Sequence, residues 1–364
     1  MKVTQLKVLI AGNLANLGYE LAKALRDNGT DAKLLLPKFP AQTEDPKFIY
    51  PELEEYPKWL VRYDNSKRNL SLDNWKLQII REMRKKCYDI IIAMTEFPIF
   101  AMFSSKPFVV ISTGSDMREL LPEKSLTGML LRLSYKKAKK ITFAEPDKWP
   151  IIEKFRFSEK SIFLEIPRNS KIFSQKIDKG NLQDKLVIFH PTAQDWKCKG
   201  NEKFIQAYIR LCATRDDIHL LISNRGPDIE KVKKNLIDSP AKDKFELLPL
   251  LGTEKLQYYY NLSDVIVDQF TVGSFGMITR EAMQCAKPVL VKINEYLFTK
   301  FYKNMPNGII NVSTEDQIFY QIDRLASNRE LCVQLGQQNR KWVEETFNNN
   351  VLTQKFVDLC ESLL

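Results

Sequence analysis

The sequence predicts an α/β protein with two doubly wound parallel sheets, one after the other along the chain. Two observations carry this prediction. Short β-rich runs alternate with helical patterns over nearly the whole chain, which is typical of parallel strands joined by crossover helices. The length of 364 residues exceeds what one core usually organises, so two domains of roughly 150 to 200 residues are expected.

The first half begins with an apolar run that fits a buried strand. We expect a strand over residues 6–11, a helix over 16–28 and a strand over 32–36. Residues 37–70 interrupt this rhythm with five prolines and scattered charge, and a helix over 73–86 follows. The remaining strands expected in this half are residues 89–93, 108–112, 141–144 and 161–165.

The second half repeats the alternation after residues 167–184, whose Pro, Asn, Ser, Gly and mixed charge mark an interdomain linker. Six strands are expected, over residues 186–190, 218–223, 245–248, 265–268, 288–293 and 308–312. Four helices alternate with them, over residues 201–213, 228–237, 254–262 and 276–285. We predict an N-terminal domain of residues 1–170, a C-terminal domain of residues 171–345, and a C-terminal helix within 346–364 that packs back toward the N-terminal domain.

Bulk composition limits the classes of protein. Basic side chains outnumber acidic ones by 55 to 45, and the net charge of +10 favours anionic partners such as phosphates, lipid headgroups or nucleic acid. No apolar run reaches the roughly 18 residues of a membrane span. Six widely spaced cysteines without a Cys-x-x-Cys pair indicate neither a zinc cluster nor a disulfide framework. The first apolar patch is too short for a signal peptide, so we expect a cytoplasmic protein.

The most informative segment is a strand, a turn with two glycines and a helix over residues 267–283. The helix that Gly276 opens would direct free N–H groups at an anion, and its dipole would contribute about 0.3–2 kcal/mol. Gly276 lets a ligand approach the backbone. Glu281 could accept two hydrogen bonds from a ribose diol, because an ionised carboxylate is a pure acceptor. A turn glycine and a solvent-facing glutamate are the alternative for this segment taken alone.

Further candidates follow the strand over residues 186–190. Lys199, beside Gly200, could neutralise phosphate through charge-assisted hydrogen bonds of about 1.5–3 kcal/mol, and Lys197 lies two residues away. His190, one of two histidines, ends the strand and could bind a diphosphate or an incoming hydroxyl. A surface lysine and a structural histidine are the alternatives.

These segments resemble those of retaining GT-B glycosyltransferases of family 4. GSFG at residues 273–276, EAM at 281–283 and KPV at 287–289 resemble the family's Glu-x7-Glu region. Two further segments resemble the family: LGT at 251–253 with the run to Asp264 and Val265, and HPT at 190–192 with Trp196, Lys199 and Gly200. In the family, the lysine before this glycine contacts the donor diphosphate.

The resemblance implies a fold and assigns a different substrate to each domain. Two Rossmann-like domains would face a cleft, with the acceptor on the N-terminal side and a nucleotide diphosphate-sugar donor on the C-terminal side. The acceptor-side residues that the resemblance implies are Gly12, Asn13 and Asn16 in the first loop, and Gly114, Ser115 and Asp116 in a loop similar to the family's H-G-T-D region.

The resemblance also implies a hexosyltransferase-like enzyme that retains anomeric configuration. Lys199 and Glu281 would act at the reacting centre. The donor-binding residues that it implies are His190, Lys197, Lys199, Gly252, Gly273, Ser274, Phe275, Gly276, Met277 and Glu281.

Four positions depart from the family pattern. Gly273 replaces the first glutamate of Glu-x7-Glu, and the arginine that accompanies the diphosphate lysine would fall near Ala193 or Gln194. Ser112 or Thr113 replaces the histidine of the H-G-T-D region. Ala286 replaces a helix-ending glycine, where left-handed geometry costs a non-glycine residue about 1 kcal/mol. We expect these changes to leave the fold unchanged and to bear on sugar specificity and activity.

Several other classes of site lack their motif. The sequence has no Gly-x-x-x-x-Gly-Lys phosphate loop, no complete Gly-x-Gly-x-x-Gly fingerprint and no Gly-x-Ser-x-Gly elbow. It also has no Asp-x-Asp, which metal-dependent transferases of another fold carry. We therefore expect no metal site and no cofactor beside the donor.

A basic run lies on a helix expected from Ser125, and consists of Arg132, Lys136, Lys137, Lys139 and Lys140. Among apolar neighbours, it could contact anionic lipid and bring a lipid-linked acceptor to the cleft, as a peripheral protein of the inner membrane face. A solvated helix face is the alternative. No pattern of stacking aromatic and basic residues supports nucleic-acid binding.

Three functions follow from the sequence. The first is transfer of a sugar from the donor to an acceptor hydroxyl of a glycan, a lipid-linked molecule or a small molecule. The second is a nucleotide-sugar epimerase or phosphorylase on the same fold. The third is a non-catalytic nucleotide-sugar-binding protein, which the glycine at 273 and the absent arginine motivate.

Overall fold

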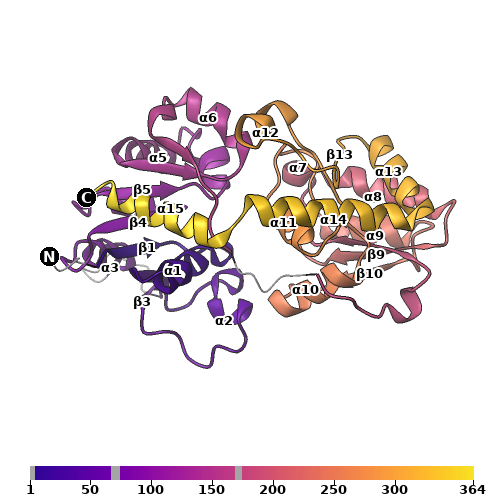
Figure 1. Cartoon of the computed structure of the whole chain (residues 1–364), viewed down its shortest axis with the longest axis horizontal. Coiled ribbons are helices and arrows are strands. Elements are labelled where there is room, and N and C mark those ends of the chain that lie inside the picture. Colours follow the sequence, from indigo (N-terminus) through magenta and orange to yellow (C-terminus); the bar gives the residue numbers. More distant parts are fainter. Residues whose placement is uncertain (1–4, 67–73, 169–173) are drawn as a thin grey trace. The chain divides into compact units, whose positions relative to one another are not determined.

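The structure is a computed structural model that describes residues 5–66, 74–168 and 174–364. The chain divides into two compact units (Figure 1). The N-terminal unit comprises Met1–Asn169 with Phe347–Leu364, and the C-terminal unit comprises Ser170–Thr346. The domain boundary expected between residues 170 and 171, with residues 169–173 of the expected linker, lies outside the described residues.

The N-terminal unit contains a seven-stranded parallel sheet in the order β3-β2-β1-β4-β5-β6-β7. Its strands are β1 (Lys7–Ala11), β2 (Asp31–Pro37), β3 (Leu60–Tyr63), β4 (Ile90–Met94), β5 (Phe108–Ile111), β6 (Lys140–Phe143) and β7 (Ser161–Phe163). The sequence did not predict β3, because its four residues lie among prolines and have no alternating pattern. Tertiary pairing decides it, since Leu60 pairs with Leu34 of β2.

Helices lie between these strands (Figure 1). They are α1 (Leu17–Asp27), α2 (Pro46–Ile49), α3 (Trp75–Met83), α4 (Phe97–Ala101), α5 (Leu126–Lys137), α6 (Trp149–Lys154) and α15 (Asn349–Glu361). Short 3-10 turns occur at Leu14–Asn16, Gln42–Glu44, Pro146–Lys148 and Ser158–Lys160, and a π turn at Asp116–Leu120. The last helix, α15, packs against α1, and the Asn349 side chain bonds both backbone groups of Arg168 at 2.6 and 3.0 Å. These bonds fix the C-terminal helix to the N-terminal unit.

The C-terminal unit contains a six-stranded parallel sheet in the order β10-β9-β8-β11-β12-β13. Its strands are β8 (Leu186–His190), β9 (Ile218–Ser223), β10 (Phe245–Leu248), β11 (Val265–Val267), β12 (Val289–Val291) and β13 (Ile309–Asn311). The first three have the predicted bounds. Every residue of β8, β11 and β12 is buried, as expected for apolar runs inside a parallel sheet, whereas the edge strands β10 and β13 are partly exposed.

The helices of this unit are α7 (Trp196–Lys199), α8 (Glu202–Cys212), α9 (Ile229–Ile237), α10 (Thr253–Leu262), α11 (Met277–Gln284), α12 (Glu295–Phe301), α13 (Glu315–Ser327) and α14 (Arg329–Thr346), with a 3-10 turn at Gly180–Leu182. Four of these helices, α7, α12, α13 and α14, were not predicted from the sequence. A capping box between Thr314 and Gln317 marks the start of α13 and could have indicated it. Ala286, just past α11, has φ 55°, which confirms the expected left-handed geometry. None of the described helices combines the length and apolarity needed to cross a bilayer.

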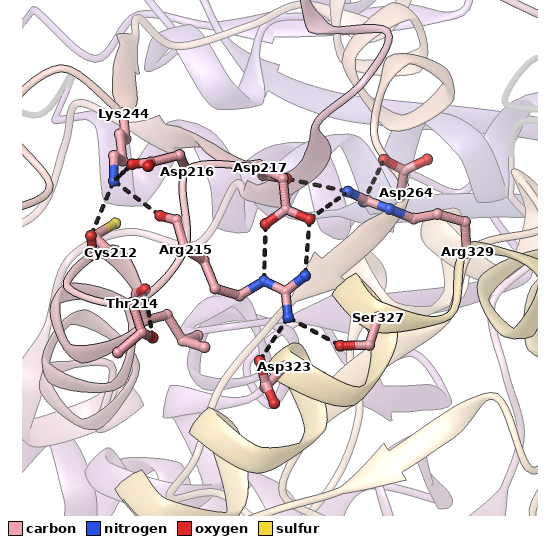
Figure 2. Close-up of polar contacts among 11 residues, drawn as sticks. Cys212, Thr214, Arg215, Asp216, Asp217, Lys244, Asp264, Asp323, Ser327 and Arg329 are labelled. Carbon is pink, nitrogen blue, oxygen red and sulfur yellow. Dashed lines mark hydrogen bonds and ion pairs between the residues drawn. The ribbon is translucent and has the colours of Figure 1, made fainter.

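A network of ion pairs ties the amino ends of the C-terminal strands to the last helices (Figure 2). Arg215 bonds both carboxylate oxygens of Asp217 at 2.8 Å and reaches Asp323 of α13 at 2.8 Å. Arg329 of α14 lies 3.5 Å from Asp217 and 3.9 Å from Asp264. Hydrogen bonding to Arg215 lowers the pKa of Asp217. Because Asp217 and Asp264 directly precede β9 and β11, this network occupies the edge opposite to the carboxyl ends of the strands.

Strand order reverses once in each sheet. In the N-terminal unit β1 lies between β2 and β4, and in the C-terminal unit β8 lies between β9 and β11. Ligands of open parallel sheets bind beyond the carboxyl ends of strands at such switch points. The loops after β1, β4, β8 and β11 therefore define where each unit can bind a ligand.

Candidate active site

Two loops at the switch point of the C-terminal unit are bonded directly to each other. The Phe270 N–H donates to the Lys199 carbonyl at 2.7 Å, and the Thr271 hydroxyl donates to the Cys198 carbonyl at 2.5 Å. Between them Gly200 has φ 65°, and a Cβ there would lie 2.6 Å from Thr271 Cγ2. The close approach requires glycine. The structure thus brings the predicted diphosphate lysine against the loop that leads into α11.

The Gln269 side chain shapes this second loop from within. Its Oε1 accepts from the N–H groups of Thr271 and Val272 at 2.9 and 2.7 Å. Its Nε2 donates to the carbonyls of Ser274 and Lys292 at 2.7 and 3.3 Å. Gln269 is 3% exposed, so these bonds satisfy backbone groups that would otherwise be buried without partners. The sequence analysis missed this residue, although a polar residue directly after an apolar strand was a visible signal.

Asp268, also missed, links three segments beneath the loops. Its carboxylate accepts from the Thr192 hydroxyl at 3.2 Å and from the Thr279 hydroxyl of α11 at 2.7 Å. Burial raises the pKa of Asp268, while the Thr279 hydrogen bond and the nearby charge of Lys199 act in the opposite direction. The Lys199 ammonium is therefore close enough to Asp268 to interact with it, at the carboxyl end of β11.

The amino end of α11 offers donors and open space. Gly276 precedes the helix, is exposed, and provides no side-chain cap for the N–H groups of the first turn. No described atom lies within 4 Å of where its Cβ would be. Ser274, 5% exposed, has a buried hydroxyl oxygen that finds no hydrogen-bond partner in the described parts of the chain. Together these features fit an anion at this helix terminus.

Gly273 and Glu281 occupy the two glutamate positions of the family motif. Gly273 has φ 79°, a left-handed conformation in which a glutamate would cost about 1–2 kcal/mol. The loop geometry of this chain thus favours the glycine. Glu281, half-buried on α11, accepts from the Tyr260 hydroxyl at 2.9 Å. Tyr260 is fully buried, and burial followed by the charge of Glu281 raises its pKa well above the ordinary value. Tyr260 therefore donates its proton to the carboxylate and orients it.

His190 lies in the interior. It has no exposed surface, its Nδ1 lies 2.8 Å from the Val267 carbonyl, and its Nε2 lies 3.2 Å from Asn201 Nδ2. Burial lowers the pKa of His190 to about 4. A neutral ring that donates from Nδ1 and accepts at Nε2 satisfies both contacts. The structure thus gives His190 the packing role that was the alternative for a strand-end histidine, with no atom available to a ligand.

The other predicted donor residues have varied positions. Gly252 precedes α10 without a side-chain cap, as Gly276 does for α11, and Met277 is the first residue of α11. Phe275 is buried against Phe298, Tyr302 and Trp342, so its ring supports the loop from inside the protein. Lys197 is exposed on α7.

Arg225 is a cation at this edge that sequence reasoning overlooked. It follows β9 by two residues, and its carbonyl accepts from the Gln194 N–H at 2.8 Å. Its guanidinium bonds the Ser223 hydroxyl at 3.2 Å and has no carboxylate partner within the described residues. Surrounding protein displaces solvent from the guanidinium and lowers its pKa, although the side chain as a whole is exposed. Arg225 thus stands beside Gln194, where the family's arginine was expected and is missing.

The N-terminal unit has a cavity of about 250 Å³ at its own switch point. Of the predicted acceptor-side residues, Gly12, Asn13, Ser115 and Asp116 line it, and Asn16 and Gly114 do not. The remaining lining residues are Leu14, Leu35, Pro37, Glu44, Tyr63, Thr95, Glu96, Phe97 and Leu120. The structure therefore brings the loops after β1, β4 and β5 to one cavity, which we call the acceptor pocket after the residues that the sequence predicted on the acceptor side.

Asn13 lines this pocket, and Asn16, which does not line it, supports the same loop. Asn13 accepts from the Tyr19 N–H at 2.7 Å and donates to the Glu44 carbonyl at 2.7 Å and to Asn16 Oδ1 at 3.0 Å. Asn16 donates to the Thr43 carbonyl at 3.1 Å. Both side chains are buried, so they position the loop that carries Glu44.

Asp116 organises the opposite wall. One carboxylate oxygen accepts from the N–H groups of Thr113 and Gly114 at 3.1 and 2.7 Å, and the other accepts from the Tyr135 hydroxyl at 2.6 Å. Behind this loop Lys148, which has no exposed surface, pairs with Glu145 and donates to the Ser112 carbonyl at 2.8 Å. These bonds hold the loop in position at the point where the family has a histidine.

The polar wall of the acceptor pocket is acidic. Burial and the neighbouring carboxylate of Glu96 raise the pKa of Glu44. Burial, followed by the charges of Glu96 and Glu44, raises the pKa of Tyr63. No lysine, arginine or histidine occurs among the described residues that line this cavity. The pocket therefore suits a ligand that donates hydrogen bonds better than one that carries negative charge.

Comparison with solved structures identifies the architecture. The chain superposes on Anabaena HepE in complex with UDP and glucose with a TM-score of 0.78, at 13% identity, over 99% of this chain and 100% of that one. Sucrose-phosphate synthase from Thermosynechococcus elongatus gives a TM-score of 0.75, at 14% identity, over 99% of both chains. The chain has the GT-B fold. This confirms the predicted fold class.

Sequence comparison assigns the C-terminal unit. Residues 172–342 match the family described as glycosyl transferases group 1. A stretch of 148 residues is 25% identical to alpha-monoglucosyldiacylglycerol synthase of Acholeplasma laidlawii. This match covers 39% of the chain and 37% of that relative, which is little more than a third of the relative's length. The C-terminal unit, which contains the bonded loops and α11, is thus the part that matches glycosyl transferases.

Proposed function

We propose that the protein is a glycosyltransferase that moves a sugar from a nucleotide diphosphate-sugar, bound by the C-terminal unit, to a hydroxyl of an acceptor bound in the acceptor pocket. One observation carries the proposal. The loop that ends in Lys199 is bonded through two backbone carbonyls to the loop that opens α11. The first N–H groups of α11 have no side-chain cap, and no described atom lies within 4 Å of where a Cβ on Gly276 would be. We therefore propose that Lys199 and the amino end of α11 bind the same anion, the diphosphate of the donor.

This arrangement fits the chemistry of sugar transfer. The bond between the anomeric carbon and the phosphate oxygen breaks, the electron pair leaves with the diphosphate, and the acceptor oxygen bonds the anomeric carbon and loses its proton. Negative charge develops on the departing oxygen. Lys199, Arg225 and the N–H groups at the start of α11 are placed to stabilise it, and such preorganised donors usually make the largest electrostatic contribution to rate. The resemblance to family 4 supports retention of anomeric configuration.

We propose that Glu281 binds the ribose hydroxyls of the donor. Its carboxylate can only accept hydrogen bonds, and the Tyr260 hydroxyl orients it. UDP-glucose is the first donor to test, because the related structure of HepE contains UDP and glucose. The sequence lacks Asp-x-Asp, so we further propose that transfer needs no metal ion, and turnover should persist in EDTA.

The decisive experiment compares two lysines of α7 that differ in position and carry the same charge. Lys199→Ala should lower turnover at least a hundredfold, which corresponds to about 2.7 kcal/mol of transition-state stabilisation. Lys197→Ala is the matched control and should retain turnover within a few-fold, since Lys197 is exposed. Equal activity of both variants would remove Lys199 from the mechanism.

The donor itself is found by a thermal-shift panel of UDP-, GDP- and ADP-sugars. A ligand at a hundred times its dissociation constant stabilises the folded protein by about 2.7 kcal/mol. Product analysis with and without acceptor then separates the alternatives. An altered sugar without any acceptor would indicate an epimerase, a sugar phosphate formed from inorganic phosphate would indicate a phosphorylase, and donor binding without any product would indicate a binding protein.

A further inference from the structure

Helix α5 presents an apolar stripe to solvent. Leu126, Met129 and Leu133 are 68%, 46% and 47% exposed, and they repeat at helical spacing along one face. The opposite face, which includes Leu131 and Tyr135, is fully buried against the N-terminal unit. The exposed stripe is therefore not needed for the core of this unit.

The stripe leads to a second cavity, of about 580 Å³. Lys137, the last residue of α5, continues the line of Leu126 and Leu133 and lines this cavity together with Lys106 and Lys139. The remaining walls consist of Met102, Ser105, Pro107, Phe108, Leu363 and Leu364. Phe108 begins β5 and Lys139 directly precedes β6, so this cavity lies at the amino edge of the sheet, opposite to the acceptor pocket. It is separate from the proposed site of sugar transfer.

Basic side chains predominate around both features. Residues 124–144 contain six basic side chains and no aspartate or glutamate. Within the described parts of the chain, the ammonium groups of Lys137 and Lys139 have no hydrogen-bond or ion-pair partner, and that of Lys106 donates to the Tyr88 carbonyl at 2.7 Å. The carbonyls at the end of α5 are instead satisfied by Lys160, which donates to those of Lys136 and Ala138 at 2.6 and 3.1 Å. Lys137 and Lys139 thus do not cap the end of α5.

We propose that the N-terminal unit binds the surface of an anionic lipid bilayer through α5 and the lysine-lined cavity. The stripe enters the boundary between headgroups and acyl chains, the lysines contact lipid phosphates, and the cavity accommodates one headgroup against its apolar walls. Apolar area combined with attraction to anionic lipid is what gives interfacial helices their affinity. This goes beyond the proposed function, because it assigns a surface that donor and acceptor binding do not use.

Charge complementarity favours a bilayer over the other occupants. In a symmetric contact between two copies, the lysines of one α5 would meet those of the other, and this helix has no acidic residue to pair with them. Nucleic acid would match the lysines and leave the three apolar side chains exposed. An anionic membrane surface matches both the charge and the apolar stripe.

Sedimentation of the full chain with vesicles tests the proposal. The protein should bind phosphatidylcholine vesicles that contain phosphatidylglycerol, should not bind phosphatidylcholine alone, and should dissociate in high salt because surface charges are screened. The variant Leu126→Ser/Met129→Ser/Leu133→Ser and the variant Lys137→Gln/Lys139→Gln should each bind at least tenfold more weakly. Unchanged binding of either variant, or equal binding to both kinds of vesicle, would overturn the proposal.

Matched controls separate this surface from general apolarity and charge. Tyr320→Ser/Val333→Ser changes exposed apolar side chains of the C-terminal unit, and Lys303→Gln/Lys355→Gln removes the same charge elsewhere. Both should bind vesicles as the wild type does. Urea denaturation of every variant reports folding, and donor titration reports the proposed transferase site, so failure of one proposal is visible without the other.

Two further outcomes would replace the bilayer with another partner. Concentration-dependent dimerisation that the serine variant abolishes, without vesicle binding, would assign the stripe to a second copy of the chain. Soluble glycerol phosphate that bound as tightly as the vesicles would assign the cavity to a free phosphate ester. Either result overturns the proposal.

Discussion

Mild acid should destabilise the C-terminal unit through one buried side chain, His190. The pKa of this histidine is about 4 in the folded protein, against 6.5 for an unperturbed imidazole. Burial is the main cause, and the hydrogen bond to the Val267 carbonyl opposes it in part. Between these two values the unfolded chain binds a proton that the folded chain does not.

The sign and size of the effect follow from this difference. A depressed histidine pKa contributes stability that is complete above pH 6.5 and is lost as the pH falls toward 4. The difference of about 2.5 pKa units corresponds to about 3 kcal/mol, with a slope of at most about 1.4 kcal/mol per pH unit. Since domain stabilities are about 5–15 kcal/mol, this loss is large enough to measure.

The assay is urea denaturation between pH 4.5 and 7.5 for the wild type and His190→Asn. Asparagine can still donate to the Val267 carbonyl and does not titrate. The variant should therefore be less stable at pH 7, and its free energy of unfolding should depend less steeply on pH, by up to the uptake of one proton. In NMR, the chain's two histidines should give resolvable ring signals, and that of His190 should not titrate near pH 6.5. A titration near 6.5, or an unchanged pH slope in the variant, would refute the reasoning.

Two further predictions concern the donor loops. Gln269→Leu leaves the N–H groups of Thr271 and Val272 without their acceptor. The free energy of unfolding in urea should fall by about 1–3 kcal/mol, and the donor should bind more weakly. Wild-type values for both would show that the loop does not depend on this amide. Gly276→Ala should change the free energy of unfolding by about 1 kcal/mol or less, because φ is −117° and no described atom lies within 4 Å of the new methyl group. Its donor affinity should nevertheless fall at least tenfold, since the methyl group enters the space proposed for the diphosphate, and undiminished affinity measured by calorimetry would place the diphosphate elsewhere.

Regular elements with a clear apolar period could be predicted with their bounds. Strands β8, β9 and β10 begin and end where the sequence placed them, because each is a short, mainly apolar run between turn residues. Strand β3 could not be predicted, since four residues among prolines carry no period and only pairing with β2 makes them a strand. Helices α13 and α14 lie beyond the last predicted strand, and their capping box was overlooked.

The sequence by itself determined that two parallel α/β units follow one another and that a turn with two glycines opens a helix after Gly276, because these features depend on neighbours along the chain. Only the tertiary structure decided which polar residues meet. The two donor loops are supported by side chains that follow other strands, Arg225 after β9 and Asp268 and Gln269 after β11. His190 points inward and contacts the Val267 carbonyl. Contacts across a sheet join residues far apart in sequence, so the sequence could not give them. Burial, which lowers the pKa of His190 and raises that of Glu44, is likewise a property of the packed molecule and not of any local segment.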